Sequence, residues 1–127
     1  MPQPSEDEAM LRGAWRLLHD ALGHLALSAP DQIAWLASVM CPDELALDFD
    51  HAYGVSWMPR EAGWISDELS RHLAEIDRLT AELTEEGAAP WSAEGLRSHP
   101  TWQRLRILAC HALALMPPAP WDGDSDS

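Results

Sequence analysis

Apolar residues recur at three- and four-residue intervals along the segment 66–86, and this period constrains the fold more than any other feature of the chain. Such spacing places apolar side chains on one face of an α-helix, whereas a strand would need strict alternation. Ser66 is a typical N-cap residue, and Gly87 suits the left-handed turn that ends many helices. The apolar stripe of this predicted helix is Leu69, Leu73, Ile76, Leu79 and Leu83.

The same period predicts helices elsewhere in the chain. One spans 5–27, and Ser5 with Glu8 forms a capping-box pattern at its start. Another ends before Pro42, because a proline disfavours helix in the residue that precedes it. The last spans 98–116 and is followed by prolines.

The stretch 43–53 is compatible with two secondary structures. Leu45, Leu47 and Phe49 alternate with smaller or polar residues, as they would in a strand. However, Leu45, Phe49 and Ala52 also lie at helical spacing, and an acidic start after a proline is typical of a helix N-terminus. We favour a short helix.

These elements predict an all-α chain, a compact bundle of four main helices plus one or two short helices. A single helical domain is expected over 5–116, with an irregular loop over 54–65 inside it. We expect residues 1–4 to be disordered and 117–127 to form a Pro-rich and then acidic disordered tail.

The chain carries 21 acidic residues against 8 basic ones, and every basic residue is an arginine. The formal net charge of -13 on 127 residues argues against nucleic acid as a partner, because phosphate binding needs a basic surface. It favours a partner with a positively charged protein surface. No apolar run approaches the roughly 20 residues that span a bilayer, so we expect a cytoplasmic protein with no membrane partner.

Patterns typical of catalysis or metal binding are not found in the sequence. Asp20 and His24 are one helical turn apart, but His19 diverges from them and no second pair completes a ligand shell. No nucleophile motif, phosphate loop or dinucleotide fingerprint is present. We expect no enzymatic activity, no cofactor and no metal, and we expect Cys41 and Cys110 to be buried free thiols.

Acidic residues gather between positions 43 and 50, and tryptophans follow them in the predicted loop. Like charges at this density repel, and a basic surface or a cation opposite them relieves the repulsion. A solvated acidic face, a protein-binding patch and a metal site are the alternatives, although the spacing matches no calcium loop. Tryptophans can pack a loop onto the bundle or anchor an interface. The predicted partner-binding residues are Asp43, Glu44, Asp48, Asp50, His51, Tyr53, Trp57 and Trp64.

Short motifs over 43–116 resemble small helical bacterial immunity proteins of the contact-dependent growth inhibition type. These motifs are ELALDFD at 44–50, ISDEL and IDRL within 65–79, and LRSHPTW at 96–102 with the apolar helix that follows. The resemblance implies a helical protein that binds a toxin domain and blocks its active site. Because many such toxins are nucleases with basic clefts, it also implies an acidic inhibitor that mimics phosphates.

Two functions from different classes follow. The first is an acidic binding protein, a monomer or weak homodimer, that neutralises a cognate toxin domain by covering its basic surface. The alternative is a helical scaffold or adaptor subunit that acts through homo- or hetero-oligomerisation, with the helix over 66–86 as its contact face. A metal-dependent enzyme ranks last.

Overall fold

The computed structural model describes residues 6–39, 44–117 and 120–121. These residues fold into helices without any strand, which confirms the predicted all-α class. In chain order the helices are α1 (Glu6–Ala26), α2 (Ala29–Val39), α3 (Glu44–Gly54), α4 (Trp57–Glu61), α5 (Asp67–Glu85), α6 (Ala93–Ser98) and α7 (Pro100–Ala114).

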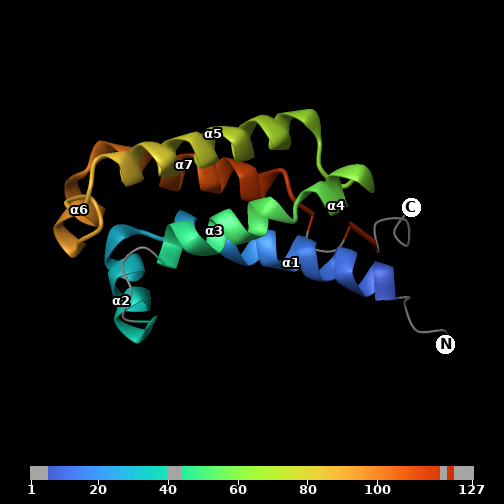
Figure 1. Cartoon of the computed structure of the whole chain (residues 1–127), viewed down its shortest axis with the longest axis horizontal. Coiled ribbons are helices and arrows are strands. Elements are labelled where there is room, and N and C mark those ends of the chain that lie inside the picture. Colours follow the sequence, from blue (N-terminus) through green and yellow to red (C-terminus); the bar gives the residue numbers. More distant parts are fainter. Residues whose placement is uncertain (1–5, 40–43, 118–119, 122–127) are drawn as a thin grey trace.

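The helices α1, α3, α5 and α7 form an antiparallel bundle (Figure 1). Around the bundle α1 packs on α3, α3 on α5, α5 on α7, and α7 back on α1. The short helix α4 packs on α1 at one end, and α2 packs on α6 at the other. The contact between α3 and α5 is the least extensive of these, so this seam is the most open side of the bundle.

The core includes the predicted apolar stripe of α5. All five stripe residues of α5 are buried, and they face α3 and α7 as their helical spacing requires. The largest fully buried side chains include those of Trp15, Phe49 and Trp102. Trp102 satisfies its indole N–H by donating a hydrogen bond to the Pro90 carbonyl at 2.8 Å.

Several predicted helix ends are confirmed. Ser66 caps α5, because its hydroxyl accepts a hydrogen bond from the Leu69 amide at 3.1 Å. Gly87 follows α5 with a φ of +90°, a conformation that favours glycine. The predicted capping box of α1 includes Ser5, which lies outside the described residues.

One polar side chain ties α2 to the rest of the bundle. Gln32 is completely buried, and its amide donates hydrogen bonds to the carbonyls of His24 at 3.2 Å and Leu25 at 3.0 Å. These carbonyls belong to the last turn of α1, where carbonyls have no amide partner within the helix, and the His24 carbonyl also accepts from the Leu27 amide at 3.3 Å. Gln32 therefore closes the end of α1 and positions α2 against it.

The structure corrects some expectations. The sequence predicts an irregular loop over 54–65, but this segment contains α4. Pro59 is the buried residue of this helix, whereas Trp57 is exposed. Cys110 is an exposed free thiol rather than a buried one, because it follows the buried Ala109 and points about 100° away from it. Cys41 lies outside the described residues.

Of the predicted tail over 117–127, the structure describes residues 117 and 120–121. The described part of 117–127 returns to the bundle, where the Trp15 indole donates a hydrogen bond to the Pro117 carbonyl at 3.2 Å. The ring of Trp121 packs 5.5 Å from that of Trp64 and beneath the guanidinium groups of Arg12 and Arg16. Among the described helices, none is both long enough and apolar enough to cross a lipid bilayer.

Candidate protein-docking site

The helix α3 carries most of the predicted binding residues, and its buried face decides where they point. The helical interpretation of 43–53 is confirmed over 44–53, with Leu45, Phe49 and Ala52 buried. Leu47 is 52% exposed on the opposite side of α3, and Asp50 and His51 are exposed as well. The outer face of α3 therefore combines an aliphatic side chain with ionisable groups.

The predicted acidic patch is divided by the helix. Glu44 and Asp48 are four residues apart and share one side of α3. Asp50 is two residues beyond Asp48, which rotates it by about 200° around the helix axis. These carboxylates therefore serve two different surfaces, and Asp43 lies outside the described residues.

Asp50 lies instead in a groove along the open seam between α3 and α5. We call this the acidic groove, and its volume is about 220 Å³. Its lining residues are Ala46, Leu47 and Asp50 from α3, and Asp77, Thr80, Ala81 and Thr84 from α5. Small side chains on both helices allow a partner to approach closely, with a carboxylate on either side.

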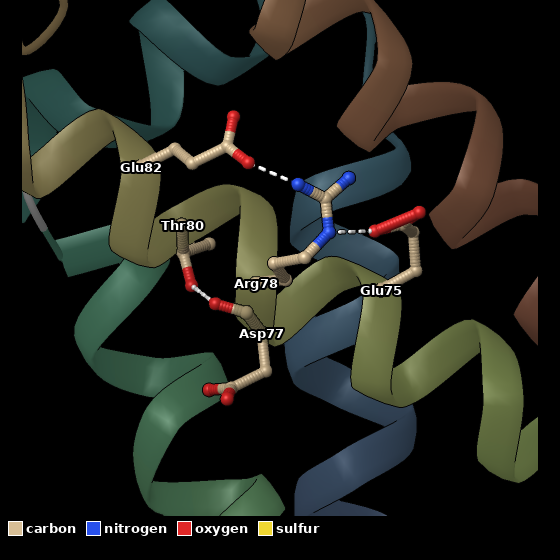
Figure 2. Close-up of polar contacts among 5 residues, drawn as sticks. All are labelled: Glu75, Asp77, Arg78, Thr80 and Glu82. Atoms are coloured by element: carbon tan, nitrogen blue, oxygen red, sulfur yellow. Dashed lines mark hydrogen bonds and ion pairs between the residues drawn. The ribbon is translucent and has the colours of Figure 1, made fainter.

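The threonine hydroxyl groups of the acidic groove donate to their own helix. The Thr80 hydroxyl donates to the Asp77 carbonyl at 2.9 Å, and the Thr84 hydroxyl donates to the Thr80 carbonyl at 3.1 Å. The side chain of Asp77 extends from α5 toward α3 (Figure 2). The carboxylates of Asp50 and Asp77 are thus the charged acceptors that the groove offers to a partner.

The arginine that follows Asp77 in α5 is committed to other contacts. Arg78 lies between Glu75 and Glu82, and it pairs with both (Figure 2). The hydrogen bond from Arg78 is the main reason that the pKa of the Glu75 carboxyl is lowered, although desolvation opposes it. Within 6–39, 44–117 and 120–121, no ion pair involves Asp50 or Asp77. The negative charge of the acidic groove is therefore not neutralised by the described arginines.

The aromatic residues predicted to anchor a partner have different environments. Trp64 is partly buried against the core, with its ring centroid 6.0 Å from that of Trp15 and 5.5 Å from that of Trp121. Tyr53 is half-buried and stacks on Phe49 at 5.6 Å. Trp57 is the exception, because 48% of it is exposed. Of these aromatic residues, Trp57 is the one that offers a large surface to a partner.

The sequence did not single out Asp77, Leu47 or the threonines of α5 as site residues. Asp77 follows the buried Ile76 and lies at the edge of the α5 stripe, which is the available local signal. Its place in the same groove as Asp50 depends on how α3 and α5 pack, and the spacing within each helix does not encode that packing. Among the described residues, no group of three or more His, Cys, Asp and Glu side chains could hold a metal ion.

His24 belongs to internal packing rather than to a ligand cluster. Its ring stacks on that of Trp35 with centroids 4.2 Å apart, and the two planes meet at 24°.

Comparison of this chain with protein-family models, with curated proteins and with solved structures finds no match. The function is therefore inferred from the charge and shape of the described surface.

Proposed function

We propose that this chain is an acidic binding protein that neutralises a cognate toxin domain by occluding its basic active-site surface. The observation that carries the proposal is the acidic groove, which is lined by Asp50 from α3 and Asp77 from α5 without an arginine partner among the described residues. An arginine or lysine of the partner would satisfy both carboxylates.

The composition of the groove suits a protein partner. Leu47 adds an exposed aliphatic contact beside the carboxylates, and Ala46 and Ala81 present little bulk to an incoming side chain. Interfaces combine buried apolar contacts with charge pairs that fix orientation. A free cation would not need the aliphatic contact, so we favour a protein surface.

The net charge supports rapid capture of such a partner. A formal charge of -13 on a chain of 127 residues creates a long-range field that attracts a positively charged domain. A protein that protects a cell from a toxin benefits from fast association. The resemblance of 43–116 to immunity proteins supports this class, and a nuclease-type toxin in the cytoplasm is the partner that we favour.

The proposal predicts that a toxin domain is encoded beside the gene for this chain. The test uses that domain, with binding measured by stopped-flow fluorescence and inhibition measured on the toxin's own reaction. The association rate constant should fall by about tenfold or more between roughly 50 mM and 500 mM salt. The double variant Asp50→Asn/Asp77→Asn should bind about tenfold more weakly.

A matched control changes the net charge equally outside the groove. Asp20→Asn/Glu85→Gln removes one carboxylate from α1 and one from α5, and neither residue lines the acidic groove. The groove variant should lose far more affinity than this control. Equal losses would mean that only net charge matters, and a toxin domain that neither binds nor is inhibited would exclude the proposed function.

The scaffold alternative receives less support. It relies on the helix over 66–86 as a contact face, yet the apolar stripe of α5 is buried in the core of the bundle. The outer side of α5 carries polar and charged residues such as Arg71 and Arg78, which are exposed. Light scattering that detects a stable dimer at low concentration would favour the scaffold alternative.

A further inference from the structure

A second groove lies between α1 and α4, away from the acidic groove. We call it the Trp57 groove, and its volume is about 290 Å³. Its walls are mainly apolar, with an acidic residue contributed by each helix. The lining residues are Asp7, Met10 and Leu11 from α1, and Trp57, Met58 and Glu61 from α4.

We propose that the Trp57 groove binds a protein segment that carries an apolar anchor side chain beside arginine or lysine. Met10 is 59% exposed and Trp57 is 48% exposed, so a large apolar area meets solvent at one place. Contiguous patches of this kind usually mark interaction sites. Tryptophan is enriched among interface hot spots, and methionine adapts its shape to varied partners.

The groove is fixed by the local backbone. The amide of Ala62 donates to the Met58 carbonyl at 3.1 Å, and the amide of Trp64 donates to the Pro59 carbonyl at 3.0 Å. Pro59 is the buried residue of α4, and α4 packs on α1. Trp57 and Met58 are therefore held in place before a partner arrives, which reduces the entropy lost on binding.

Charge decides which partner the groove prefers. Asp7 and Glu61 line it from opposite helices, whereas the nearby Arg12 is engaged with Glu8 at 2.9 Å and lies over the Trp121 ring. A second copy of this chain would bring the same acidic residues and a net charge of -13. An anionic lipid surface would be repelled as well. A cationic segment with an apolar anchor is the occupant that complements both the apolar lining and the carboxylates of Asp7 and Glu61.

This inference goes beyond the proposed function, since it requires no toxin. The probe is a synthetic amphipathic helical peptide of leucine and lysine, with a leucine and glutamate peptide as its control. Methionine methyl groups labelled with ¹³C report binding by NMR. The methyl signals of Met10 and Met58 should shift with the lysine peptide, while that of Met116, which is 6% exposed in the core, should not.

Variants separate this groove from other surfaces. Trp57→Ala should weaken binding of the lysine peptide by about tenfold or more, whereas Ile107→Ala should not, although Ile107 is 57% exposed on α7. The double variant Asp7→Asn/Glu61→Gln should weaken peptide binding several-fold while leaving the core unchanged. This variant tests the groove if Trp57→Ala fails to fold. Asp50→Asn/Asp77→Asn should leave the Met58 shift unchanged, which distinguishes the two grooves.

Other results would overturn the proposal. Methyl signals of Met10 and Met58 that do not move at peptide concentrations on the order of 1 mM would exclude this occupant. Equal binding of the glutamate peptide would show that Asp7 and Glu61 do not select a cationic partner. Shifts that follow dilution of the protein alone, or the addition of phosphatidylglycerol vesicles, without a response to peptide would assign the groove to a second copy or to a membrane.

Discussion

Arg106 donates a hydrogen bond from Nε to the side-chain oxygen of Gln32 at 3.0 Å, although 74 positions separate the two residues. Arg106 also donates to the Leu96 carbonyl in α6. Together with the bonds from Gln32 to the last turn of α1, this network connects α1, α2, α6 and α7. The Arg106 side chain lies partly inside the protein, and this burial lowers the pKa of its guanidinium.

Replacement of Gln32 should therefore be costly. Gln32→Ala removes the acceptor of Arg106 and the donor to the His24 and Leu25 carbonyls, so the free energy of unfolding should fall by about 1–3 kcal/mol. Urea denaturation measures the change. Gln103→Ala, at an exposed position of α7, is the matched control and should stay within about 0.5 kcal/mol. Equal effects of the two substitutions would contradict a structural role for the network.

Trp121 should stabilise the bundle from the C-terminal side. Trp121→Ala removes the packing on Trp64 and the cation–π contacts from Arg12 and Arg16, whose distances to the ring centroid are 5.2 and 5.0 Å. We expect a loss of about 1–2 kcal/mol in the free energy of unfolding. Trp57→Ala is the control, since Trp57 is largely at the surface and should cost less. A Trp121→Ala variant as stable as the unaltered chain would refute this contact.

Two glycines should respond to alanine with opposite signs. A Cβ atom at Gly95 would lie 2.4 Å from the Pro90 carbonyl oxygen, which already accepts the Trp102 indole, so Gly95→Ala should destabilise by about 1–3 kcal/mol. A Cβ atom at Gly23 meets nothing within 4 Å inside α1, so Gly23→Ala should stabilise by about 0.5–1 kcal/mol. Thermal unfolding of both variants tests the pair. A Gly95→Ala variant at least as stable as the unaltered chain would contradict the close approach of Pro90.

The Glu75–Arg78 pair should give a measurable pH dependence. Hydrogen bonding from Arg78 lowers the folded-state pKa of Glu75 below its ordinary value of 4.5. The pair therefore stabilises the fold above that value, and its contribution disappears as the pH falls through the folded pKa. The melting temperature of Glu75→Gln should lie slightly below that of the unaltered chain near neutral pH, and the difference should vanish in acid.

Salt and a second variant check this interpretation. Both partners are exposed, so added salt at neutral pH should shrink the difference. Glu85→Gln changes the same charge on the same helix at a residue without an ion pair among those described, and it should lack this acid-dependent loss. A difference for Glu75→Gln that persists unchanged in acid would mean that the effect is not electrostatic.

Local features predicted the helices well. The stripe of α5 and its Ser66 cap act within one turn, so their consequences are visible in the sequence. Even the division of the acidic patch follows from the rotation between Asp48 and Asp50. The short helix α4 lacked such a signal, because Trp57, Met58 and Pro59 have no repeating period and Ser56 makes no side-chain cap to α4.

Contacts between distant segments were beyond local reasoning. Nothing near Gln32 indicates that Arg106 will donate to it, and nothing near Asp50 indicates that Asp77 will line the same groove. Such pairs depend on the order of helices around the bundle, which is decided by the summed packing of many apolar side chains. Trp121 shows the same limit. Its acidic and proline-rich surroundings predict disorder, whereas its ring packs against that of Trp64.

The meeting of Arg12 and Trp121 brings the first helix and the last described turn within 5.2 Å of each other. A circular permutant could therefore join Trp121 to Glu6 through a linker and open at the exposed turn around Gly87. Every helix would keep its neighbours while α7 left the ribosome before α1. Comparing the refolding of the two chains would separate the influence of synthesis order from that of native packing.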